Sequence, residues 1–181
     1  MWVWRVFSRV NLQANDFELF DLKQKFSQDR SAIDTRWKDL QREAHPDKFA
    51  AQGSAAQRVA MQWSVRINEA YQRLKDPLKR AAYLCELNGA AVNSENNTAM
   101  PASFLMQQIE WREALDEAKT HENTNKIALE ANEYMCEQLL NLKQSIDVKN
   151  DFKLAVDQVR SLMFVERFLS EVDARIGQLQ Q

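Results

Sequence analysis

Glycine and proline are both scarce in this chain of 181 residues, with three of each. Turns are therefore few, and long helices are expected between them. Alternating runs of β-branched residues bounded by turn residues are also absent, so no β-strand is predicted. Because 45% of the residues are hydrophobic, the chain can still bury a real core. The sequence predicts an all-α protein.

Paired cysteines are absent as well. Cys85 and Cys136 stand alone, without a CxxC spacing, which argues against a disulfide framework and a structural zinc site. His121 is the only histidine besides His45, so histidine-based metal binding has little support. Both cysteines are expected on or near apolar helix rows, where a free thiol packs as a small hydrophobe. No metal and no cofactor are predicted.

Neither charge sign dominates: 24 basic and 26 acidic residues give a formal net charge of −2. A general nucleic-acid-binding protein would show a basic excess, so none is predicted. No apolar run approaches the roughly 20 residues of a membrane-spanning helix. The start, MWVWRVFSRV, lacks the apolar core and cleavage site of a secretory signal. Residues 1–15 are interpreted as a disordered leader or the product of an upstream start codon, and a transit peptide stays open.

A few residues that favour helix ends divide the chain into helices. Asp29 is a natural N-cap, Pro77 suits a first helical position, and Gly89 suits a helix end. Helices are expected near 16–22, from after Asp29 to Ala44, from after Ser54 to about Lys75, from Pro77 to about Asn88, and near 101–119, 123–147 and 150–178. The polar stretch GAAVNSENNTAM is interpreted as a linker, residues 89–100. It separates a first unit, 16–88, from a three-helix bundle, 101–181.

The second of these helices ends in LQREAHPDKFA, residues 40–50. At about 100° per residue, Lys38 and Arg42 lie opposite its apolar stripe, and His45 projects to nearly the same side. They are expected to form an unopposed basic pair leading into His45, Pro46 and Asp47. Proline commonly follows a helix end, so ordinary termination explains the tripeptide alone. A catalytic histidine–aspartate pair is the alternative, but no nucleophile or glycine-rich elbow accompanies it.

The order of helices around this tripeptide resembles the J-domain of DnaJ-type co-chaperones. The resemblance is carried by RWKDLQREAHPDKFA and INEAYQRLKDPLKRAAYL. With FLMQQIEWREALDEA at the start of the bundle, about residues 16–180 are similar to the HscB family of iron–sulfur cluster assembly. One departure is Ala44, where many J-domains carry a tyrosine, and this is expected to affect affinity but not function.

The resemblance implies a co-chaperone that is not itself an enzyme. Its J-domain would bind and stimulate an HscA-type ATPase chaperone of the DnaK class. The residues that match the family's chaperone-binding region are Lys38, Arg42, His45, Pro46, Asp47 and Lys48. Its bundle would carry the IscU-type iron–sulfur scaffold protein. The residues that match this role are Leu105, Met106, Ile109, Glu110, Glu113, Glu117 and Phe164.

Helical geometry agrees with an exposed face in the bundle but leaves an alternative open. Phe164 lies about 100° off the core row of the last helix, which favours exposure. Met106 and Ile109 could instead be partly buried at a second seam, with the glutamates solvated.

The lack of an N-terminal zinc motif favours a bacterial form in the cytoplasm over a mitochondrial one. Nothing demands a dimer, so a monomer is expected. Two other functions remain open. One is a J-protein with a different cargo, and the other is a small hydrolase that uses His45 and Asp47.

Overall fold

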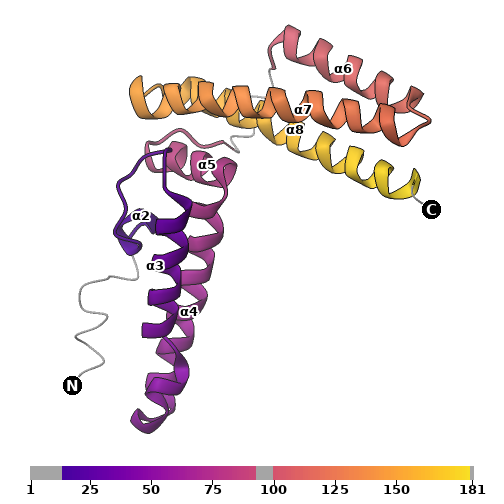
Figure 1. Cartoon of the computed structure of the whole chain (residues 1–181). Coiled ribbons are helices and arrows are strands. Elements are labelled where there is room, and N and C mark those ends of the chain that lie inside the picture. Colours follow the sequence, from indigo (N-terminus) through magenta and orange to yellow (C-terminus); the bar gives the residue numbers. More distant parts are fainter. Residues whose placement is uncertain (1–13, 93–99, 180–181) are drawn as a thin grey trace. The chain divides into compact units, whose positions relative to one another are not determined.

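The computed structural model describes residues 14–92 and 100–179. Within these ranges the chain forms helices and no β-strand, so the predicted all-α fold is confirmed. The elements, labelled as in Figure 1, are α2 (Asp16–Leu19), α3 (Arg30–Glu43), η1 (Pro46–Gln52), α4 (Ser54–Lys75), α5 (Pro77–Leu87), α6 (Ala102–Glu117), α7 (His121–Lys143), η2 (Gln144–Val148) and α8 (Phe152–Leu179). They belong to two compact units, Met1–Leu84 and Cys85–Gln181.

The first unit is built on a hairpin of α3 and α4, which lie side by side in opposite directions (Figure 1). Both α2 and η1 pack against α4. The core between these elements consists of large apolar side chains with no more than a few per cent exposure. It includes Phe17, Phe20, Ile33, Leu40, Trp63, Ile67 and Leu74. The apolar stripe predicted for the second helix therefore faces the core, as do the buried residues of α4.

Local signals set most helix ends where the sequence predicts them. The Asp29 carboxylate accepts a hydrogen bond from the backbone N–H of Ser31 at 2.9 Å, as an N-cap does. Pro77 is the first residue of α5, and Gly89 follows that helix with a φ of 75°. The first helix is shorter than predicted, because Asp21 adopts a φ of 54° and the helix ends at Leu19.

The segment after His45, which lies between two of the predicted helices, is itself helical. It forms the 3₁₀ segment η1, which the buried Phe49 anchors to the first unit. Gly53 then takes a φ of 93° and starts α4. A short 3₁₀ segment is a common connector between α-helices, but its periodicity is too brief to stand out in the sequence.

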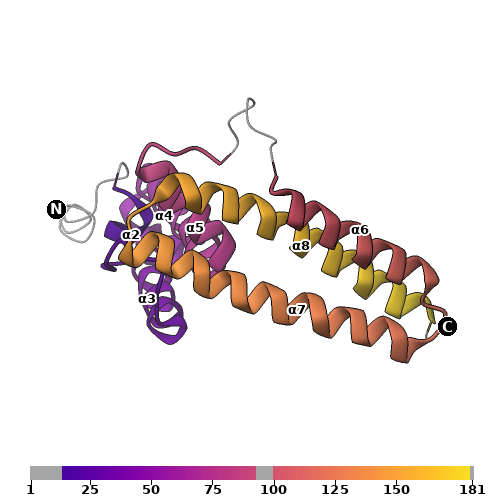
Figure 2. The same ribbon diagram turned by 90° about the horizontal axis from the view of Figure 1, so that it is seen from above.

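The second unit contains α6, α7 and α8, with α7 antiparallel to the other two (Figures 1 and 2). The π-helical turn η2 and Asn150, which has a φ of 53°, lead from α7 into α8. The three predicted helices are confirmed, with ends that shift by a few residues.

The division between the two compact units falls inside α5. The boundaries 16–88 and 101–181 remain predictions. Most of the predicted leader and linker, residues 1–13 and 93–99, lies outside the described residues.

Candidate functional site

The turn that ends α3 is fixed by its own residues. The ring Nδ1 of His45 accepts a hydrogen bond from the backbone N–H of Asp47 at 3.3 Å, which caps η1. Pro46 is the first residue of η1 and has a restricted φ. The Asp47 Oδ2 atom lies 3.6 Å from His45 Nδ1. We call His45, Pro46 and Asp47 the HPD corner.

The HPD corner is anchored on both sides while its polar groups remain in water. Ala44 before it and Phe49 after it are buried, and the Ser64 hydroxyl donates a hydrogen bond to the Ala44 carbonyl at 3.1 Å. The side chain of Asp47 is 88% exposed and that of His45 is 58% exposed. The corner therefore presents a carboxylate to solvent on a backbone held from both sides.

The basic face of α3 is present but not unopposed, which corrects the sequence prediction. Lys38, Arg42 and Lys48 are all exposed. However, the Arg42 Nη1 atom lies 3.3 Å from Asp39 Oδ1, one turn earlier on the same helix. An exposed pair of this kind contributes at most about 1 kcal/mol. Exchanging this pair for an ion pair with another protein would therefore cost Arg42 little free energy.

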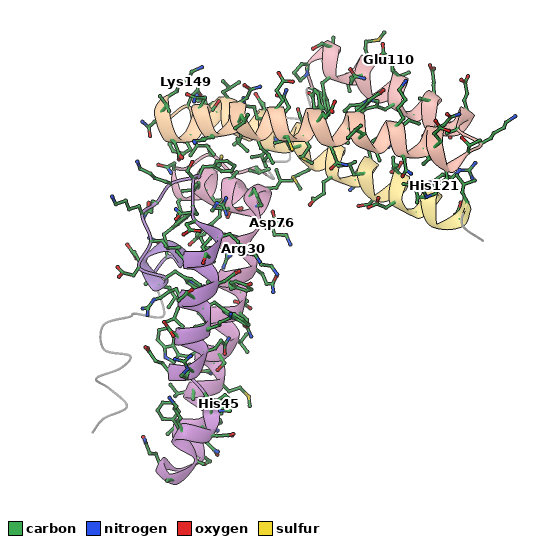
Figure 3. All side chains as sticks on the ribbon, viewed as in Figure 1. Arg30, His45, Asp76, Glu110, His121 and Lys149 are labelled. Carbon is green, nitrogen blue, oxygen red and sulfur yellow. The ribbon has the colours of Figure 1, made fainter. Side chains whose placement is uncertain are left out.

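The other end of α3 is tied to α4 through Asp34. Its Oδ1 atom accepts hydrogen bonds from Arg30 at 2.8 Å and from the Tyr71 hydroxyl at 2.9 Å, and the Tyr71 ring stacks on Trp37. Desolvation raises the pKa of the Asp34 carboxyl, but the hydrogen bonds and the charges of Arg30 and Lys38 outweigh it, so the pKa is lowered. These contacts connect the first half of α3 to α4. Figure 3 places Arg30 and His45 at opposite ends of the hairpin.

Sequence reasoning missed a buried ion network in this unit. Asp16 is fully buried, with its carboxylate 2.6 Å from Arg66 Nη2 and 2.8 Å from Arg73 Nε. Its backbone N–H donates to the Tyr83 hydroxyl at 3.0 Å. The network connects α2 to α4 and α5. The available signal was the spacing of Arg66 and Arg73, which puts both on one face of α4.

In the second unit, α6 has apolar residues on two opposite sides. Phe104 and Trp111 are buried, and Trp111 stacks on Phe168 with ring centroids 5.5 Å apart and meets Tyr134 edge-on at 5.3 Å. Phe168, on α8, is fully buried. Aromatic contacts of this kind fix which side of α6 faces the bundle.

The opposite side of α6, its outward face, is exposed. Leu105, Met106 and Ile109 are 48%, 59% and 51% exposed, so each keeps about half of its surface open to solvent. The outward face also contains Glu110, Glu113 and Glu117, all exposed. It combines large apolar side chains with a row of carboxylates, and Figure 3 shows Glu110 pointing away from the bundle.

Phe164 is 45% exposed and lies on the side of α8 next to α6. Two contacts establish this alignment: the Ser161 hydroxyl is 3.5 Å from the Met100 sulfur, and Arg112 is 3.6 Å from Glu171. Since α6 and α8 run in the same direction, their residues advance together at about 1.5 Å per residue. Phe164 is therefore level with the first half of α6, where the apolar part of the outward face lies.

The two cysteines differ in environment. Cys85 is buried, and burial raises the pKa of its thiol to about 11. Cys136 is exposed, so the prediction that it packs near an apolar row is wrong. Among the described residues, no group of three or more histidine, cysteine, aspartate or glutamate side chains could hold a metal ion.

No helix within residues 14–92 and 100–179 has the length and apolar character needed to cross a membrane.

The arrangement at the HPD corner offers little for hydrolysis. The side chains of His45 and Asp47 are exposed to solvent. They therefore lack the water-excluded surroundings that many enzymes use to increase the reactivity of catalytic groups.

Comparisons with known proteins agree with both units. The family model described as the HSCB C-terminal oligomerisation domain matches residues 100–173. A co-chaperone protein HscB homolog from Burkholderia thailandensis is 45% identical over 174 residues, covering 94% of this chain and 99% of that protein. A homolog from Paraburkholderia xenovorans is 43% identical over 173 residues, with the same two coverages.

Solved structures give the same result over nearly the whole chain. The chaperone HscB from Vibrio cholerae matches with a TM-score of 0.80 and 32% identity, covering 92% of this chain and 99% of that chain. The human co-chaperone protein HscB matches with a TM-score of 0.82 and 25% identity, covering 94% and 84%. The sequence resemblance is thus confirmed, and the chain belongs to the HscB family, the co-chaperones of iron–sulfur cluster assembly.

Proposed function

We propose that this protein stimulates the ATPase of an HscA-type chaperone and delivers an IscU-type scaffold protein to it. The observation that carries the proposal is the HPD corner, where Asp47 is 88% exposed on a backbone fixed by Pro46 and the His45 cap. Such a corner loses little conformational entropy when it binds. Its carboxylate is available for a charge-assisted hydrogen bond with an arginine of the chaperone.

The charges on α3 supply the approach to this partner. Lys38, Arg42 and Lys48 are exposed near the corner and would steer it toward an acidic surface of the chaperone. Stimulation follows only if the J-domain binds the hydrolysis-competent state of the chaperone more tightly than the other state. In this mechanism the protein contributes no catalytic group, and the partner performs the hydrolysis.

The outward face of α6 is the proposed site for the scaffold. Leu105, Met106 and Ile109, with Phe164 from α8, would form the buried centre of the interface. The three glutamates would form its charged rim and select a basic partner surface. The bacterial relatives support a cytoplasmic location for the protein.

Oligomeric state is a separate point. The family model's description names oligomerisation, whereas a monomer is expected from the sequence. The outward face of α6 needs no second copy to present its residues, so the proposal holds for a monomer.

Assembly of a ternary complex tests the proposal. Analytical ultracentrifugation of the protein with an HscA-type chaperone and an IscU-type scaffold is expected to show one species that contains all three. Mutually exclusive binding would contradict the adaptor role. Capture of a different cargo with no affinity for the scaffold would instead support another J-protein function.

A further inference from the structure

The first unit exposes large apolar side chains on one helix. Across its described residues these are Val59, Met61 and Val65, and all three lie on α4. Met61 and Val65 are 60% and 52% exposed and one helical turn apart, so their side chains are neighbours. Val59 points to a different side of the helix. Single exposed apolar residues are ordinary, whereas a contiguous exposed apolar patch is a feature of binding surfaces.

The pair lies in a hollow of the surface rather than on a flat helix. The hollow has a volume of about 470 Å³. Its described lining consists of Arg58, Met61, Gln62, Val65, Arg66 and Glu69. An apolar floor with a polar and charged rim has the composition of a protein-binding surface.

Hydrogen bonds fix where this pair lies relative to the HPD corner. Gln41 donates to the Ser64 carbonyl at 3.2 Å and to the Asn68 side chain at 2.7 Å, and Ser64 donates to the Ala44 carbonyl. The last turns of α3 are thus level with the middle of α4. Met61 and Val65 are within one turn of Ser64, so they are level with the end of α3 and with the corner.

The helical angles put the pair on the same side of the hairpin as the basic residues. In projection down the axis of α3, Lys38 and Arg42 lie beyond Gln41 on the side away from the core. In projection down the axis of α4, Met61 and Val65 lie beyond Ser64, also on the side away from the core. The seam between the helices therefore has basic side chains on one flank and apolar side chains on the other.

We propose that Met61 and Val65 form the apolar part of the surface that binds the ATPase chaperone. This inference rests on the proposed function. The exposed residues of α3 and the corner supply charge and hydrogen bonding, but the large exposed apolar side chains of this unit are on α4. Charges steer encounter, whereas desolvated apolar contacts slow dissociation. The matching chaperone surface would have an apolar patch beside an acidic one.

The test compares three forms of the full chain for binding to an HscA-type chaperone by calorimetry. The double variant Met61→Ser with Val65→Ser is expected to weaken the Kd roughly tenfold, as expected for loss of an apolar contact centre. At saturating concentration its maximal ATPase stimulation is expected to equal that of the unmodified protein, because the HPD corner is intact. Val59→Ser, on another side of the same helix, is the matched control and is expected to bind normally.

Circular dichroism melting checks that the exposed substitutions leave the fold intact. An unchanged Kd for the double variant would overturn the inference while the proposed function stands. Failure of the unmodified protein to stimulate the chaperone would overturn the proposed function itself. If the double variant loses only self-association in light scattering, the pair binds a second copy and the inference is wrong.

Discussion

The two units present their candidate binding surfaces by opposite means. In the first unit, the HPD corner interrupts a helix and exposes charge on a backbone fixed by local contacts. In the second, the outward face of α6 is part of a regular helix and exposes apolar side chains next to a row of carboxylates. The first surface depends on the shape of the main chain. The second depends on which side of a helix its neighbours leave uncovered.

This difference has a consequence for the kind of damage each surface tolerates. A single polar atom is decisive at a rigid corner, because no neighbour replaces its hydrogen bond. An apolar face distributes its contribution over several side chains, so single truncations cost less.

The largest expected effect is at the corner. Asp47→Asn is expected to abolish stimulation of an HscA-type ATPase, because the neutral amide cannot make the charge-assisted bond. Stability should be unchanged, since the side chain is 88% exposed. ATPase rates measured across a concentration series check this prediction, with Glu43→Gln as the exposed control one turn earlier. Full stimulation by the Asp47 variant would remove the basis for assigning the corner.

The second prediction concerns the stability of the first unit and not its binding surface. Asp16→Asn is expected to destabilise the protein by about 3 kcal/mol, because it leaves Arg66 and Arg73 without a buried counter-charge. Urea unfolding followed by tryptophan fluorescence measures the change. The control is Asp21→Asn, at an exposed residue whose positive φ asparagine also tolerates. Its free energy of unfolding should lie within about 0.5 kcal/mol of that of the unmodified protein. Equal losses for both variants would refute a structural role for the network.

The third prediction tests the apolar half of the comparison. Met106→Ala combined with Ile109→Ala is expected to weaken binding of an IscU-type scaffold at least roughly tenfold. Stimulation of the chaperone without scaffold should be unaffected. Leu129→Ala on α7, at a residue 60% exposed, is the matched control. Calorimetry that gives the same affinity for all three proteins would exclude the outward face.

The smallest expected effect concerns the charges on α3. Lys38→Ala or Arg42→Ala is expected to slow association with the chaperone a few-fold at low salt, with little effect on dissociation. Stopped-flow kinetics at two salt concentrations separate the two rates. A change confined to dissociation would mean that these side chains are buried contacts and not steering charges.

Local signals explain why several helix ends could be predicted from the sequence. Asp29, Pro77 and Gly89 act on the backbone within one turn, and the structure keeps each of them at a helix end. The pairing of Arg42 with Asp39 was also local, since the two are three residues apart. The helix face that Lys38 and Arg42 share does not reveal this pairing, because Asp39 lies to one side of it.

Features that depend on distant residues could not be read in this way. Nothing near Asp16 indicates that arginines some 50 residues later neutralise it. Likewise, α6 has apolar residues on both sides, and only its contacts with Phe168 and Tyr134 decide which side is buried. The exposure of Cys136 and the core position of Phe168 have the same origin. In such cases tertiary packing selects among faces that the pattern leaves equivalent.

If the protein couples the scaffold to the chaperone through these two surfaces, the two partners should act together on the ATPase rate. The measurement is the ATPase rate of an HscA-type chaperone with this protein alone, with an IscU-type scaffold alone, and with both. We expect the rate with both to exceed the sum of the separate increments, and Met106→Ala with Ile109→Ala to remove the excess. A rate with both that equals the sum of the separate effects would contradict it.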